Sequence, residues 1–218
     1  MLYKLIIIFF LTIFPIYLFG QKNNYCFSTS LAVGKNNFDK YPVKFGNGNH
    51  VFSQQIRSFD IELGIRKSNN YFGTIYQIST SKSGMVNSNN FAFYFGDAFQ
   101  FKYARFFLNN KKFNICPYIK LGVQNGTFVY SNDTNYSNSS MNLGQSNEIS
   151  TIITNPKGSF GFQFKYEISK TNFVSLFIEG SSGLVSSKVR NYSNSIIDNY
   201  TFNPIFFQFG ATYTKSRF

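Results

Sequence analysis

From Tyr25 onward, apolar and polar side chains alternate with a period of two residues. In the first such segment the apolar phase contains Tyr25, Phe27, Thr29, Leu31 and Val33. In the second segment Phe59, Ile61, Leu63 and Ile65 share one phase, and Asp60 and Glu62 belong to the other. Successive side chains of a β-strand point to opposite faces, whereas a helix would distribute these charges around its whole circumference. The alternation therefore predicts strands with one apolar and one polar face.

Six further segments repeat this alternation, which predicts eight strands in all. Their apolar phases occupy residues 72–78, 99–107, 115–123, 160–168, 174–178 and 205–213. Short polar connections of about four residues are expected at 67–70, 109–112 and 169–172, as in tight hairpins. The other connections, 35–54, 81–90, 131–159 and 190–201, are long and rich in Asn, Ser and Gly. Short turns alternating with long loops are typical of bacterial outer-membrane barrels, with the turns in the periplasm and the loops outside the cell.

Composition agrees with a strand-built membrane protein. Aromatic residues make up 20% of the chain, including 29 Phe, while charged residues make up only 14%, against about a quarter in soluble domains. We therefore predict an all-β fold, an eight-stranded antiparallel up-and-down transmembrane β-barrel. The alternative architecture is a soluble lipocalin-like barrel. It would need a polar outer face, and pointing the aromatic phase inward instead would overfill so narrow a barrel.

Residues 1–20 have the pattern of a cleavable signal peptide, which leaves residues 21–218 as the barrel domain. Lys4 provides the positive end, an apolar stretch follows, and Gly20 is a small residue before the expected cut at Gln21. The alternative is an uncleaved membrane anchor. Cys26 lacks the small-residue motif of a lipoprotein. Cys26 and Cys116 are expected to remain unbridged, because the first and fifth strands lie on opposite sides of an eight-stranded barrel.

The arrangement of strands and connections resembles the small eight-stranded outer-membrane barrels typified by the OmpA transmembrane domain and OmpX, and the PorT-type barrels. The resemblance covers the mature chain and rests on architecture rather than on a motif. It implies insertion by the barrel-assembly machinery, which often reads a terminal aromatic residue of the lipid-facing row. Phe218 is out of phase with Tyr213, so either a bulge resets the register or Tyr213 is the last residue of that row.

Six polar residues fall at a similar distance from the short turns and in the inward phase. This lumen layer consists of Asp60, Glu62, Lys102, Lys120, Glu179 and Gln208. Charges inside a narrow barrel must pair with one another, because an isolated buried ion is very costly. We expect Lys102 and Lys120 to pair with Glu62, Asp60 or Glu179 and to close the lumen. The alternative is a gated proton or ion path, which would make the protein a narrow porin-like channel.

Catalytic signals are weak, and we predict that the chain is not an enzyme. His50 is the only histidine, and with Ser53 it invites comparison with lipid A deacylase barrels, where the His and Ser are two residues apart on a strand rather than three apart in a loop. This lipid-modifying activity is the enzymatic alternative. One His and two separated Cys do not make a zinc site, and no phosphate-binding loop or nucleophile elbow is present. We predict no cofactor.

The net charge of +12 comes from scattered Lys and Arg residues without a nucleic-acid-binding motif. It suits attraction to the anionic headgroups of outer-membrane lipid and lipopolysaccharide better than binding to nucleic acid. The sequence thus predicts a non-enzymatic outer-membrane barrel with a structural or surface-interaction role, such as adhesion or membership of a secretion complex.

Overall fold

The computed structural model describes residues 24–37, 43–45, 48–50, 55–82, 91–107, 112–131, 149–185, 187–191, 196–202 and 205–217. The predicted signal peptide and Phe218 lie outside these residues. Among the described residues, no helix combines the length and the apolar character needed to cross a bilayer.

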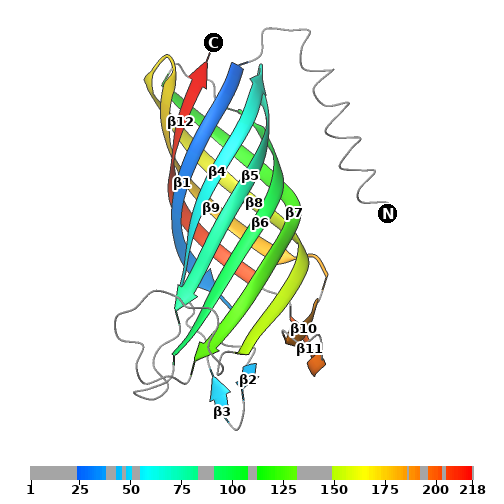
Figure 1. Ribbon diagram of the computed structural model, residues 1–218. Coiled ribbons are helices and arrows are strands. Elements are labelled where there is room, and N and C mark those ends of the chain that lie inside the picture. Colours follow the sequence, from blue (N-terminus) through cyan, green and yellow to red (C-terminus); the bar gives the residue numbers. More distant parts are fainter. Residues whose placement is uncertain are drawn as a thin grey trace.

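Eight long antiparallel strands close into a barrel (Figure 1). They are β1 (Asn24–Asn36), β4 (Gln55–Lys67), β5 (Asn70–Lys82), β6 (Phe91–Arg105), β7 (Phe113–Ser131), β8 (Ile149–Ser169), β9 (Asn172–Gly183) and β12 (Ile205–Arg217). Each strand pairs with the next one in this order, and β12 pairs with β1 to complete the ring. The predicted fold class is confirmed.

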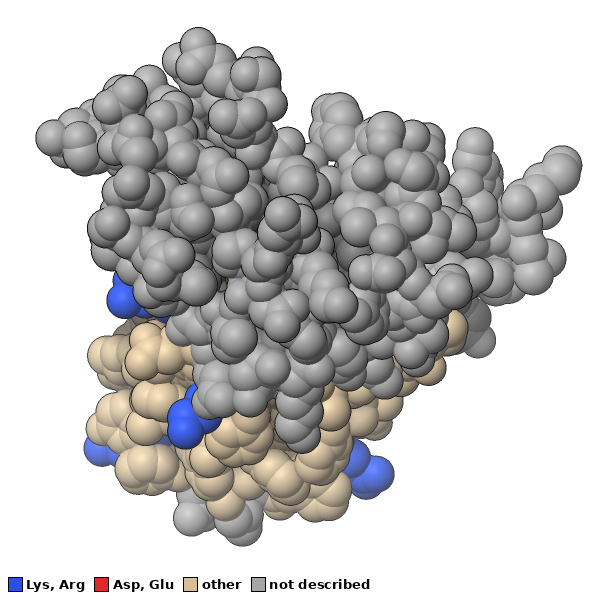
Figure 2. Space-filling view, turned by 90° about the horizontal axis from the view of Figure 1, so that it is seen from below, with Lys and Arg blue, Asp and Glu red and all other residues tan. Residues whose placement is uncertain are grey.

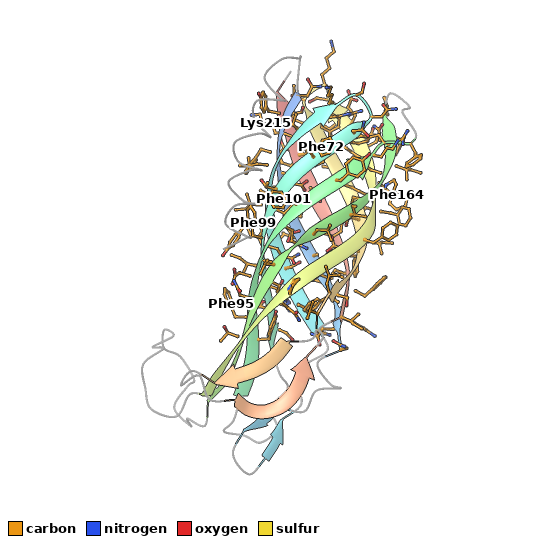
Figure 3. All side chains as sticks on the ribbon, turned by 90° about the vertical axis from the view of Figure 1, so that its right-hand side faces the viewer. Phe72, Phe95, Phe99, Phe101, Phe164 and Lys215 are labelled. Atoms are coloured by element: carbon orange, nitrogen blue, oxygen red, sulfur yellow. The ribbon has the colours of Figure 1, made fainter. Side chains whose placement is uncertain are left out.

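The two faces of the wall differ as the alternation predicts. Leu31, Leu63 and Phe207 of the apolar phase are about 60% exposed or more on the outer surface. Figure 3 shows Phe95, Phe99 and Phe101 at successive heights along the barrel and Phe164 on its other side. The inward phase is buried and mostly polar, and it also includes aromatic rings such as Tyr118 and Phe177. An outer face of this size and character is incompatible with a soluble monomer and matches the lipid-facing band of a membrane barrel. The lipocalin-like and inside-out alternatives are therefore wrong.

Short connections lie at one end of the barrel and long ones at the other (Figure 1); we call these the turn end and the loop end. At the turn end, Lys67 pairs with Asn70 across a tight turn in which Ser68 has a φ of 53°. Asn172 Nδ2 donates a hydrogen bond to Ser169 Oγ, 2.8 Å away, in the turn between β8 and β9. The connection between β6 and β7 runs from 106 to 112 and is longer than predicted.

Several strands extend further toward the loop end than the sequence predicts. The prediction assigned 131–159 to a loop, but β8 begins at Ile149 and pairs there with Tyr130 of β7. Beyond the apolar band neither face of a strand needs to be apolar, so backbone pairing continues through polar residues. Two hairpins also occupy the expected loops. In 35–54, β2 (Val43–Phe45) pairs with β3 (Gly48–His50), and a hairpin of β10 (Ser187–Asn191) with β11 (Ile196–Phe202) extends slightly beyond both ends of 190–201.

The register of β12 bears on the two readings of Phe218, which itself lies outside the described residues. Pairing with β1 runs without a shift from Phe206 to Arg217. Tyr213 is exposed on the outer face and Thr214 is buried. No bulge resets the phase within the described part of β12, so Tyr213 is the last aromatic residue that this part contributes to the lipid-facing row.

Large rings fit inside the narrow barrel because they lie over glycines of neighbouring strands. Phe177 of β9 pairs with Gly210 of β12, and a Cβ at that glycine would come within 2.7 Å of the ring. Tyr118 of β7 has the same relation to Gly161 of β8. A residue without a side chain permits this close approach. The lumen is thus filled by side chains that cross from strand to strand.

Candidate functional site

The centre of the lumen layer is a triad of buried ions. Lys120 Nζ of β7 lies 2.5 Å from Glu179 Oε2 of β9 and 3.7 Å from Asp60 Oδ2 of β4. The side chains of all three are at most 6% exposed. Neither β4 nor β9 is a neighbour of β7 in the barrel, so these contacts cross the lumen rather than run along its wall.

A second ion pair lies beside the triad. Lys102 Nζ of β6 is 3.2 Å from Glu62 Oε2 of β4, and it also donates a hydrogen bond to Gln163 Oε1 of β8 at 3.3 Å. The ammonium group lies 4.7 Å from the centre of the Tyr118 ring, a cation–π contact. Lys102 therefore connects its own strand, β6, with β4, β7 and β8.

Tyr118 connects the triad to the wall. Its hydroxyl donates a hydrogen bond to Glu179 Oε2 at 3.0 Å. Tyr118, Gly161 and Glu179 lie in one row across β7, β8 and β9, because Gly161 pairs with both of the others. The tyrosine ring can cross the middle strand only because that strand has no side chain at this point.

A polar relay extends the network toward the loop end. Lys157 Nζ of β8 donates to Gln77 Oε1 of β5 at 2.6 Å, and Gln77 Nε2 donates to Asp60 Oδ1 at 3.0 Å. The Lys157 ammonium also lies 5.1 Å from the centre of the Phe206 ring. The relay gives Asp60 a second partner besides Lys120.

All six residues of the predicted lumen layer are buried inside the barrel. The structure joins five of them into ion pairs: Asp60, Glu62, Lys102, Lys120 and Glu179. Gln208 is uncharged and lies opposite Glu179 in the register of β12 with β9. Lys120 pairs with Glu179 and Asp60, and Lys102 pairs with Glu62. The sequence offers the three carboxylates as possible partners of both lysines without assigning one to the other.

Sequence reasoning missed two further lysines of the lumen. The sequence predicts a loop at Lys157, although this residue shares the inward phase of Ser159 and Gln163, and that phase is the signal that could identify it. Lys165 belongs to the polar phase of its predicted strand but is not part of the predicted lumen layer. Its ammonium lies 4.0 Å from the centre of the Phe173 ring, near the turn end. The described lumen thus holds four lysines.

The cavities beside these groups are small. One of about 20 Å³ is lined by residues that include Glu62, Tyr71 and Lys102. Another of about 10 Å³ adjoins Lys120 and Asp60. Each has room for about one water molecule, which is too little for a substrate or a file of hydrated ions. Chemically, the arrangement neutralises charge and fills space.

Both cysteines lie between the lumen layer and the turn end. Cys26 of β1 and Cys116 of β7 are free and buried. The Cys26 thiol donates to Ser216 Oγ at 3.6 Å, and Cys116 borders the larger cavity. Among the described residues, no group of three His, Cys, Asp or Glu side chains could hold a metal ion.

The enzymatic alternative, which would bring His50 and Ser53 together, lies outside what the structure describes. The backbone of His50 pairs with Val43 in the β2–β3 hairpin at the loop end. Ser53 is not among the described residues.

Comparison with known proteins identifies the fold. Neisserial surface protein A (NspA) is 12% identical, with 88% of this chain and 96% of that chain covered and a TM-score of 0.51. The chain has the fold of a small outer-membrane β-barrel. Also similar are the attachment invasion locus protein Ail of Yersinia pestis (11% identity, 89% and 99% covered, TM-score 0.47) and a major outer membrane protein of Thermus thermophilus (8% identity, 87% and 99% covered, TM-score 0.48). No protein-family model and no curated protein matches the chain.

The fold and its apolar band agree on the location. A closed antiparallel barrel with a lipid-facing outer surface is the architecture of bacterial outer-membrane proteins. The chain is an outer-membrane barrel, as the sequence predicts.

Proposed function

We propose that this chain is a non-enzymatic outer-membrane barrel with a closed lumen, and that its role is structural or is exercised by surface interaction at the loop end. The proposal rests mainly on one observation: Lys120, Glu179 and Asp60 form ion pairs across the lumen from three different strands. Opening a path there would separate buried charges that have no bulk water to solvate them.

The two alternative functions are a narrow channel, which would run through the charged layer, and a lipid-modifying enzyme, which would act at the loop end. A narrow porin-like channel needs a continuous aqueous path, but the side chains of the layer contact one another and leave cavities for about one water each. A lipid-modifying enzyme needs His50 and a serine to converge on a substrate at the loop end. The small cavities beside the layer support neither transport nor catalysis in the lumen.

Surface interaction is the role that remains for such a scaffold. Function in a widely used fold lies in the sites attached to it, and in barrels of this kind the long loops are where such sites are usually placed. The partners that we propose are outer-membrane lipid and lipopolysaccharide around the barrel and an adhesion or secretion-complex protein at the cell surface.

The native thiols provide a test of closure. In the folded protein in detergent, a charged methanethiosulfonate reagent is expected to leave Cys26 and Cys116 unmodified, because both are at most 4% exposed. Lys170→Cys, in an exposed turn, is the positive control and should react at once. Mass spectrometry counts the adducts. It also distinguishes two free thiols from a disulfide, because forming the disulfide lowers the mass of the protein by two hydrogen atoms. Rapid modification of either native thiol in the folded protein would contradict a closed lumen.

A further inference from the structure

Cations gather at the turn end of the barrel. The described side chains there include six cations, Arg66, Lys67, Arg105, Lys112, Lys170 and Lys215, and one carboxylate, Glu167. The buried carboxylates that balance other lysines lie deeper in the lumen and do not neutralise this end. The turn end is therefore strongly basic. Figure 2 shows the opposite face, seen from the loop end, where Lys and Arg but no Asp or Glu are visible among the described residues.

Three of these cations continue the lipid-facing rows of their strands. Lys67 follows Ile65 in the outward phase of β4, Arg105 follows Tyr103 in β6, and Lys215 follows Tyr213 in β12. All three side chains are exposed, and Figure 3 shows Lys215 at the turn end. Because the phase alternates strictly, these cations project sideways toward the bilayer rather than into the lumen. Their position marks the edge of the apolar band.

Tyrosines at the same level indicate where the lipid headgroups lie. Tyr103 Oη donates to Asn70 Oδ1 at 2.9 Å, and Tyr213 Oη donates to Asn172 Oδ1 at 2.8 Å. Each ring belongs to the apolar band while its hydroxyl is held by an asparagine of the turn end. Tyrosines with one apolar and one polar side are characteristic of the membrane–water boundary.

Lys67 and Arg105 flank one of these tyrosine anchors. Asn70 of β5 pairs with Lys67 on one side and with Arg105 on the other. The two cations are thus separated by the width of one strand, roughly 10 Å between backbones. A phosphate group at the level of Asn70 would meet both positive charges and the tyrosine edge. This spacing suits a phospholipid headgroup in the leaflet beside the barrel.

We infer that the outward-facing cations at the turn end, Lys67, Arg105 and Lys215, bind anionic phospholipid headgroups in the adjacent leaflet. An anionic lipid is favoured over a zwitterionic one because nothing described on the lipid-facing side of these residues balances their charge. A lipid is favoured over a soluble acidic protein because the three side chains share the rows of the apolar band. The inference is independent of whether the lumen conducts.

The chain contains no tryptophan, so a single introduced one reports on its surroundings without background. Tyr103→Trp is refolded into phosphatidylcholine vesicles that contain phosphatidylglycerol, with one lipid or the other brominated to quench fluorescence. Quenching gives the relative affinity of the two lipids next to the reporter. We expect about a threefold preference for phosphatidylglycerol, in line with the attraction of a few interfacial cations, and its loss in 1 M NaCl.

Matched variants make the result specific. Lys67→Gln with Arg105→Gln should bring the preference at Tyr103→Trp close to one. Lys35→Gln with Arg57→Gln, which removes two outward cations near the loop end, should leave it unchanged. In a second reporter, Phe95→Trp near the loop end, the Lys67 and Arg105 changes should have no effect. Gel mobility without boiling verifies that each variant is folded. An equal affinity for both lipids at Tyr103→Trp, or a preference that survives the Lys67 and Arg105 changes, would overturn the inference.

Discussion

Lys120→Met is expected to lower the free energy of unfolding by about 3–5 kcal/mol, the typical cost of removing one partner from a buried ion pair. The methionine would fill a similar volume but leave Glu179 and Asp60 facing each other without the ammonium group between them. Urea midpoints of protein refolded in detergent measure the loss. Lys215→Met, an exposed lysine at the turn end, is the matched control and should change the midpoint little.

A double-mutant cycle separates pairing from simple burial. Lys120→Met combined with Glu179→Gln should recover part of the loss, because the glutamine is neutral and keeps an acceptor for the Tyr118 hydroxyl. Recovery should be incomplete, since Asp60 keeps Gln77 but loses Lys120. Strictly additive effects of the two changes would show that Lys120 and Glu179 do not interact, and the proposed closure would lose its main support.

Gly161→Ala is expected to destabilise the barrel by about 1–3 kcal/mol, the usual cost of overpacking. A Cβ at this position would come within 2.5 Å of the Tyr118 ring and of the backbone oxygen of Ile178. The ring would have to move, and with it the hydroxyl that holds Glu179. The free energy of unfolding in urea is the measurement.

Gly180→Ala is the control for this change. Gly180 lies on the neighbouring strand β9, and a Cβ there would meet nothing within 4 Å. The same chemical substitution should therefore be neutral or slightly stabilising. Equal effects of the two substitutions would mean that the ring of Tyr118 is not constrained by Gly161.

Strand phase made most of the fold predictable from the sequence. In a membrane barrel the outward phase must be apolar through the bilayer, so residues such as Phe59 and Ile61 reveal both the strand and its orientation. The same rule assigned Asp60 and Lys120 to the lumen. Closure of the ring by β12 and β1 followed from the count of strands, because a membrane barrel leaves no free edge.

The strand extensions and the wider polar network could not be predicted in this way. The outward phase of the segment before Phe160 consists of Thr154, Pro156 and Gly158 rather than large apolar residues, so the alternation does not reveal a strand there and the sequence predicts a loop. This is why Lys157 is missing from the predicted lumen layer, although its side chain is buried. The partners of each inward residue depend on the stagger between strands, which phase alone does not specify. The link from Lys157 through Gln77 to Asp60 therefore appeared only in the structure.

Ion conductance across planar lipid bilayers tests the closed lumen most directly. Proteoliposomes in which unboiled protein migrates as a heat-modifiable band establish that the barrel is folded before it is fused to the bilayer. With Lys120, Glu179 and Asp60 joined across the lumen, the wild-type protein is expected to give no steady current above that of the bare membrane. Stable current steps of constant size from the folded wild type would show an open channel through the charged layer and contradict the account.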